Sequence, residues 1–232
     1  MQLVEVSLTG VRTAVITLRS EDAAMRVVLF PMLHLGSPDY YQSVAERLAR
    51  CDLIVAEGIS GKSVGGWALA LAYRLPARNR RLGLTVQDID YAGLGIPVIT
   101  PDITARQFRR RWRSVPALQR LAVWCVVPLF TVSFAFLGTR RTLSRYLGSD
   151  DLPTPIQAQA RQMLPDLAQL VLDYRDGLLI DGLASIHQAH QNDNIAVAVV
   201  YGADHMPAVT HELLRRYGYR PRTAEWLTAF DF

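Results

Sequence analysis

The sequence contains little cysteine, with two residues in a chain of 232. Cys51 and Cys125 each lie in an apolar stretch, and neither belongs to a CxxC pair or to a cysteine–histidine spacing of the kind that zinc sites use. A disulfide or zinc framework is therefore excluded. We expect two buried free thiols and a reducing compartment, the cytoplasm.

The sequence also lacks the features of disordered, repetitive or secreted chains. Half of the residues are hydrophobic and 20% are charged, which indicates a chain that buries a core. We find no internal repeat of fixed period and no low-complexity tract. The first ten residues, MQLVEVSLTG, have neither a basic start nor a long apolar run, so we expect no secretory signal.

Lysine is nearly absent: Lys62 is the only lysine, and the other Lys/Arg positions are all arginine. The formal net charge is +4. Part of this excess is a run at residues 106–113, formed by Arg106, Arg109, Arg110, Arg111 and Arg113. No stacking aromatics accompany the run at regular spacing, so we expect no nucleic-acid partner. We interpret the run as a solvated helix face, with contact to anionic lipid as the alternative.

Apolar runs that alternate with helical patterns predict an α/β fold. Residues 2–8 and 13–18 alternate around Thr9-Gly10, which predicts an N-terminal β-hairpin. Buried strands are predicted at residues 26–33, 53–57 and 195–201, and a short strand at 96–100. Helices are predicted from the N-cap Ser37 to about residue 50, and at residues 64–75 and 207–217. Together with a mostly helical insertion at about 104–190, this describes one domain, residues 1–232, whose mainly parallel central sheet is flanked by helices.

The segment 121–138, LAVWCVVPLFTVSFAFLG, has no charge over 18 residues and sits at the lower edge of the length of a membrane span. A single crossing would place residues 26–100 and 195–201 on opposite sides of a bilayer, although both regions look like strands of one sheet. We expect a buried or oligomer-facing helix. An interfacial membrane contact is the main alternative, so residues 106–145 are a candidate contact with a membrane or with a second copy.

The stretch CDLIVAEGISGKS, residues 51–63, has two interpretations. Ala56-x4-Gly61-Lys62-Ser63 is a relaxed phosphate-binding loop, with alanine where the strict pattern has glycine. That loop would set the carboxylate of Glu57 against the phosphates, although such loops bind anions through backbone N–H groups. We therefore favour the second interpretation, in which a strand delivers Glu57 to a site and Lys62 is incidental.

Polar side chains follow each predicted strand of the parallel sheet. They are His34, Glu57, Asp102, Asp204 and His205. Ligands of open parallel sheets bind at the carboxyl ends of the strands, so these groups are expected to converge. Imidazole and carboxylate donors suit a divalent ion such as Zn, Mn, Co or Fe, which would activate a bound water.

Each of these residues also has a structural interpretation. His34 could cap the helix that opens at Ser37, and Glu57 could pair with an arginine. Asp204 could be a turn residue, and His205 could simply begin the last helix. His187, His190 and His211 lie in polar helical sequence, and we expect them to be exposed.

These motifs resemble the TraB/PrgY/GumN family, which includes the Tiki-type proteases and relates to the erythromycin-esterase and ChaN-like group. The family carries two GxxH motifs. The second is intact here as Gly202-Ala203-Asp204-His205, whereas the first, Pro31-Met32-Leu33-His34, has proline in place of glycine. The family glutamate matches Glu57 in LIVAEG, and DYRDGLLIDGL supplies the pair Arg175-Asp176. The stretch with Gln87, Tyr91 and Asp102 is also similar, so the resemblance covers about residues 26–210.

The resemblance implies a metal-dependent hydrolase that cleaves peptide amide bonds, or esters, with a metal-activated water. His34, Glu57 and His205 would hold the ion, with Asp204 as a further ligand. Asp102 would support a ligand or act as a base, and Arg175 would stabilise the oxyanion. Glu57 could be the base instead of a ligand. The alternative is a non-catalytic protein that binds a peptide or haem in the same pocket.

Overall fold

The computed structural model describes residues 1–58, 74–145, 149–150 and 155–232. It has a mixed α/β fold with a mainly parallel central sheet, an N-terminal hairpin and flanking helices, as the sequence predicts. In the described residues the strand order is β7-β5-β9-β3-β2-β1-β8, and β10 pairs with β2. A second, two-stranded sheet joins β4, Leu35–Gly36, to β6, Thr85–Val86.

The parallel core consists of β3 (Arg26–Met32), β5 (Leu53–Ala56), β7 (Val98–Ile99) and β9 (Ala196–Gly202). Strand β9 pairs with β3 from Ala196 opposite Arg26 to Gly202 opposite Met32, and with β5 on its other edge. Every residue of β5 and all but the last of β9 are buried. Such strands are covered on both faces, which explains their unbroken apolar sequence.

The antiparallel half of the sheet begins with β1 (Gln2–Val6) and β2 (Gly10–Arg19). Their hairpin is confirmed, with Val4 opposite Thr13. Strand β10, Arg220–Asp231, pairs with β2 along its length, and the sequence analysis had assigned it no element. Strands β2 and β10 approach so closely that a Cβ at Gly10 would lie 2.5 Å from the carbonyl oxygen of Phe230. Strand β8, Ser149–Asp150, pairs with β1.

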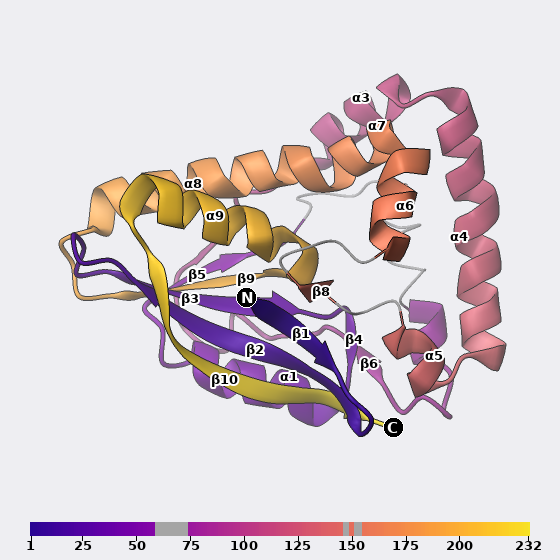
Figure 1. Ribbon diagram of the computed structural model, residues 1–232, viewed down its shortest axis with the longest axis horizontal. Coiled ribbons are helices and arrows are strands. Elements are labelled where there is room, and N and C mark those ends of the chain that lie inside the picture. Colours follow the sequence, from indigo (N-terminus) through magenta and orange to yellow (C-terminus); the bar gives the residue numbers. More distant parts are fainter. Residues whose placement is uncertain (59–73, 146–148, 151–154) are drawn as a thin grey trace.

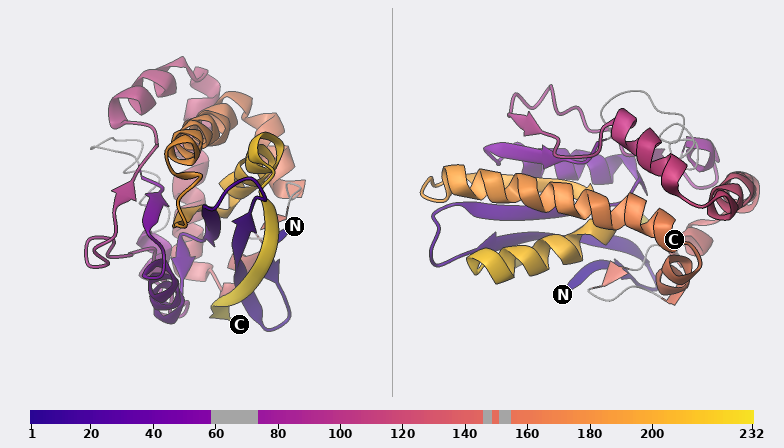
Figure 2. Two further views of the ribbon diagram at one scale, coloured as in Figure 1. Left: turned by 90° about the vertical axis from the view of Figure 1, so that its left-hand side faces the viewer. Right: turned by 90° about the horizontal axis from the view of Figure 1, so that it is seen from above.

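Helices cover both faces of the sheet, as Figures 1 and 2 show. Helix α1 (Pro38–Leu48) lies on one face, and its N-cap Ser37 accepts a hydrogen bond from the backbone N–H of Tyr40, as predicted. Helices α8 (Tyr174–His190) and α9 (Met206–Tyr217) lie on the other face. Gly218 ends α9 in a left-handed conformation with φ of 67°.

The described part of the 104–190 insertion is mostly helical. Its last helix, α8, covers the sheet, and its other helices stand at one end of the sheet (Figure 1). These are α3 (Ala105–Ser114), α4 (Ala117–Leu137), α5 (Arg140–Ser144), α6 (Pro155–Met163) and α7 (Pro165–Ala168), followed by the π-helical turn η1 (Gln169–Asp173). A small apolar cluster of Ile103, Phe108, Val115 and Leu170 fastens α3 to η1.

The segment 121–138 is helical up to Leu137, and it is not buried within the chain, which leaves the oligomer-facing helix and the membrane contact of the sequence analysis as predictions. Only 12% of the most apolar 18-residue window of α4 is buried. By length and composition alone, α4 could cross a membrane. Cys125 is correspondingly exposed, against expectation, whereas Cys51 is buried as predicted. The five arginines of residues 106–113 are exposed, as a solvated helix face requires.

The expectation that His187 is exposed is also wrong. It is buried, with its ring 3.9 Å from that of Tyr217 and its Nδ1 atom 3.4 Å from the Tyr219 hydroxyl. The side chain of His190 is 43% exposed, and that of His211 is 72% exposed. Burial lowers the pKa of His187. The predicted helix at 64–75 and the candidate phosphate loop around Lys62 lie outside the described residues, apart from their edges.

Candidate functional site

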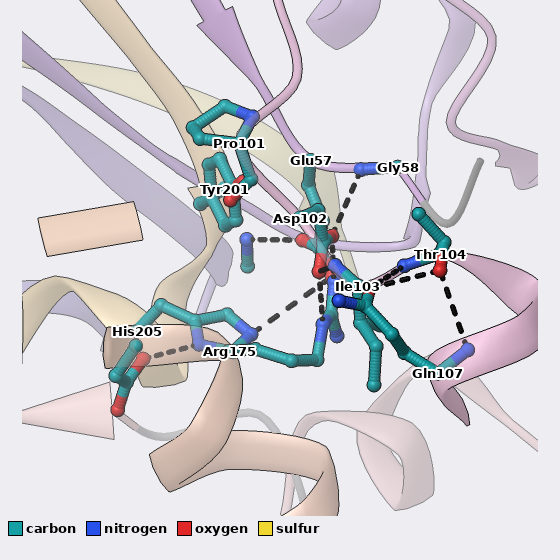
Figure 3. A network of polar contacts seen from close by, with 12 residues as sticks. Glu57, Gly58, Pro101, Asp102, Ile103, Thr104, Gln107, Arg175, Tyr201 and His205 are labelled. Atoms are coloured by element: carbon teal, nitrogen blue, oxygen red, sulfur yellow. Dashed lines mark hydrogen bonds and ion pairs between the residues drawn. The ribbon is translucent and has the colours of Figure 1, made fainter. Parts of the chain in front are cut away.

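Three segments bring polar side chains together at the carboxyl ends of the parallel strands (Figure 3). Glu57 directly follows β5, and Asp102 follows β7 after three residues. Strand β9 ends in the 3₁₀ turn η2, Ala203–His205. The first turn of α8 adds Arg175 and Asp176 from a distant part of the chain.

Arg175 is the cation at the centre of this network. Its Nε donates to Asp102 Oδ1 at 2.9 Å, and its Nη2 donates to Asp102 Oδ2 and to Glu57 Oε1, both at 2.6 Å. The guanidinium side chain is 9% exposed. Burial alone would lower the pKa of Arg175. The pKa is nevertheless raised, because the hydrogen bonds and negative charges of Asp102 and Glu57 outweigh the effect of burial.

Asp102 is saturated with donors. Its Oδ1 accepts from the Ile103 N–H at 2.6 Å and its Oδ2 from the Gly58 N–H at 3.1 Å, in addition to the two contacts with Arg175. Its side chain is fully buried. A carboxylate that accepts four hydrogen bonds and is closed to solvent is poorly placed to take a proton from substrate. Of the two roles considered for Asp102, the geometry favours support of its neighbours.

Glu57 is held at both oxygens. Oε1 meets Arg175, and Oε2 accepts the Gly202 N–H at 2.8 Å. Burial would raise the pKa of Glu57, but the charges of Arg175, His205 and His34 and the Gly202 N–H outweigh it and lower the pKa to about 2. Glu57 is therefore a carboxylate throughout the physiological pH range.

This low pKa predicts a stability loss in acid. Because the pKa of Glu57 is about 2 in the folded state, against 4.5 unperturbed, its contribution is present above pH 4.5 and is lost as the pH falls towards 2. That contribution is about 3 kcal/mol at neutral pH. Urea denaturation at several pH values should show that Glu57→Gln flattens this part of the stability profile. Glu46→Gln, at an exposed position of α1, should leave the profile as it is.

His205 and Asp176 form a second pair beside the first. Nδ1 of His205 lies 2.6 Å from Asp176 Oδ1, and Nε2 lies 3.9 Å from Glu57 Oε1. His205 is buried, and the ring of Tyr201 meets its edge at a centroid distance of 5.7 Å. A proton on Nδ1 is fixed by the carboxylate, so Nε2 presents its lone pair towards Glu57. Asp176 had no predicted role, although it follows Arg175 directly in the family-like motif.

The other predicted residues lie around this centre. The charge of His34 contributes to the low pKa of Glu57. Burial and the negative charge of Glu57 raise the pKa of Tyr91 to about 12. Asp204 is exposed, and Asp176 rather than Asp204 is the carboxylate bonded to His205. The geometry thus joins Glu57, Asp102 and Arg175 by hydrogen bonds and places His205 Nε2 3.9 Å from Glu57.

The donor set of His34, Glu57 and His205 has the chemistry of a divalent metal site. Nδ1 of His205 is bonded to a carboxylate, as in many metal-binding histidines. Within the described ranges, no group of three or more His, Cys, Asp or Glu side chains is arranged to hold a metal ion.

No protein-family model, curated protein or solved structure matches this chain.

The backbone of α8 is set against the Asp102 loop by a glycine. A Cβ at Gly182 would lie 2.6 Å from the Cβ of Pro101, next to Asp102. The π-helical turn η1 directly precedes this helix, and such turns often occur at functional sites. The close approach at Gly182 therefore helps to hold α8 where Arg175 can reach Asp102.

Two glycines of α8 test this packing. Gly182→Ala should lower the free energy of unfolding by about 1–3 kcal/mol, because the rigid proline ring must shift. Gly177→Ala should raise it by about 0.5–1 kcal/mol through helix propensity, because a Cβ there meets no atom within 4 Å among the described residues. Urea denaturation of both variants measures the difference. Equal effects of the two substitutions would contradict the packing argument.

Proposed function

We propose that the protein is a hydrolase of amide or ester bonds, with peptides as the first substrate class to test. The observation that carries the proposal is the 3.9 Å separation of His205 Nε2 from Glu57 Oε1, with Nδ1 bonded to Asp176 at 2.6 Å. Two acceptors at that separation are too far apart for a direct hydrogen bond, but one small ligand, such as a water molecule, can contact both. A water at this position would have an imidazole on one side and a carboxylate on the other.

The pKa of Glu57 decides which group acts as the base. A carboxylate with a pKa of about 2 is a weak base near neutral pH, so Glu57 orients the water and His205 Nε2 accepts its proton. Arg175 contacts the described residues through Nε and Nη2, and Nη1 is the nitrogen that can donate to the oxygen that becomes negative when water attacks a carbonyl. Asp102 holds the guanidinium in position.

A divalent metal is the alternative form of the proposal, because the family resemblance implies one. His34, Glu57 and His205 would hold it, so His205 would then be a ligand and not the base, and the bound metal would polarise the substrate carbonyl. Mass spectrometry of the purified protein should then find an ion in stoichiometric amount, lost in His34→Ala and His205→Ala. His211→Ala, at an exposed position, should keep it. If the wild type carries no such ion, the hydrolase works with His205 as the base and without a metal.

Turnover of peptide and ester libraries with fluorogenic leaving groups tests the function itself. Loss of the general base in His205→Gln should reduce the rate about 10²–10⁴-fold, while His211→Gln should match the wild type. Thermal unfolding shows whether each variant is folded. Tight binding of a peptide or haem without turnover would refute the hydrolase and favour the sequestering protein.

A further inference from the structure

Helix α4 presents an apolar face to solvent. Its exposed stripe comprises Leu118, Leu121, Cys125, Leu129, Val132 and Phe136, spaced by three or four residues. Leu118, Leu129 and Phe136 are 78%, 70% and 74% exposed. The opposite side of the helix, with Thr131 and Phe134, is buried. A helix on the surface of a soluble domain normally turns a polar face outward, so the outer face of α4 requires a partner.

The charge around this stripe has one sign. Residues 103–149 hold nine of the chain's 25 basic residues and none of its 21 acidic residues. The rest of the chain has 16 basic residues against those 21 acidic ones and is therefore acidic. Exposed arginines precede and follow α4 in the chain: Arg106, Arg109, Arg110 and Arg113 on α3, and Arg141 and Arg145 after α4. The basic character of the protein is thus concentrated around α4.

Both ends of α4 are fastened to the same folded body. At its start, Gln119 Nε2 donates to Asp166 Oδ2 at 2.6 Å. Just past its end, Gly138 O accepts from Asn79 Nδ2 at 3.4 Å, and Arg140 Nη1 donates to Asp231 O at 2.9 Å. If α4 crossed a bilayer, these two attachments would lie on opposite sides of a hydrocarbon layer about 30 Å thick. The helix can meet a membrane without losing an attachment only by lying along its surface.

We propose that α4 docks the protein on an anionic bilayer, with the helix in the plane of the interface and the flanking arginines on the lipid headgroups. An apolar face with arginines beside it is the pattern of interfacial helices. A second copy fits less well. Two α4 helices paired about a two-fold axis would bring the arginines of residues 103–149 of both copies together, and that segment has no acidic residue to offset them. Anionic lipid satisfies the apolar face and the charge together.

Vesicle co-sedimentation of the full chain tests this docking. Binding should be about tenfold or more stronger to phosphatidylcholine vesicles that contain about 30% phosphatidylglycerol than to phosphatidylcholine alone, and high salt should remove the difference. Leu129→Gln should weaken binding about tenfold. Leu8→Gln, at a 92% exposed leucine in the β1–β2 turn, is the matched control and should bind like the wild type.

Further variants test separately the contribution of the arginines and the contact of α4 with lipid. Arg109→Gln/Arg110→Gln should weaken binding to the anionic vesicles about tenfold. Arg19→Gln/Arg220→Gln, at two exposed arginines that face one another across β2 and β10, should not. Trp124, which is 48% exposed, should give a blue shift of fluorescence on vesicles that Trp124→Phe abolishes. Because the salt dependence is measured on the wild type, misfolding of a variant does not leave the proposal untested.

Two results would overturn the proposal. One is the absence of binding to either vesicle, together with a dimer in sedimentation velocity that Leu129→Gln dissociates, which would make a second copy the partner of α4. The other is equal loss of binding in Leu129→Gln and in Leu8→Gln. Neither result depends on whether the protein hydrolyses a substrate.

Discussion

Replacing Arg175 with methionine is expected to lower the free energy of unfolding by about 3–5 kcal/mol. The guanidinium is the partner of two buried carboxylates, Asp102 and Glu57, whose side chains are 0% and 16% exposed. Methionine fills similar space but leaves both charges without their cation. The burial of Glu57 would then raise its pKa instead of being outweighed by the charge of Arg175.

Urea denaturation at neutral pH gives this free energy, and Arg113→Met, at an exposed position of α3, is the control and should change it by less than about 0.5 kcal/mol. A second variant separates the charge from the packing. Arg175→Met/Asp102→Asn should be less destabilising than the sum of the two single substitutions, because each removes the same ion pair. Strict additivity would show that Arg175 and Asp102 do not depend on one another.

The parallel strands of the central sheet were predictable because each is a short apolar run in the sequence. Runs such as IVA in β5 and AVAVV in β9 are apolar without alternation, which is typical of strands covered on both faces. Strand β10 was missed because its first six residues are exposed and, apart from Ala224, polar or proline. What makes it a strand is its pairing with β2, about 200 residues earlier in the chain.

The site was predictable in part for a related reason. Residues that directly follow a strand, such as Glu57 and His205, have a position fixed by the sheet. Arg175 and Asp176 come from a helix, and only a family resemblance could connect them with the strand ends. The bond between Asp176 and His205 depends on how α8 crosses the sheet, which no spacing in the sequence specifies.

Burial of single residues was the least predictable feature. His187 lies in the polar sequence HQAHQNDN, yet its ring packs against Tyr217, the last residue of α9, and Tyr219, two residues further on. Helix α4 shows the converse, because an uncharged run of this length is compatible with burial within the chain and with burial against a partner, and the helix is largely exposed. In both cases local composition does not specify the tertiary contacts.

Asp176→Asn is expected to reduce the rate of hydrolysis about 10²–10⁴-fold and to leave the substrate KM nearly unchanged. Asp176 is a positioning residue, because it contacts His205 and acts through it. The carboxylate accepts the Nδ1 proton, which leaves Nε2 as the acceptor that faces Glu57. An asparagine can donate to Nδ1 instead, and the proton then resides on Nε2, where it blocks the base.

Nitrogen NMR of the imidazole reports this change without any substrate, because the two ring nitrogens have distinct shifts when protonated or bare. The His205 signal should move from the Nδ1-protonated to the Nε2-protonated tautomer in Asp176→Asn, and stay as in the wild type in Asp181→Asn, an exposed aspartate on the same helix. If Asp176→Asn keeps both the tautomer and the rate, the carboxylate only packs against the histidine. If the tautomer changes and the rate does not, His205 is not the base, and another group must activate the water.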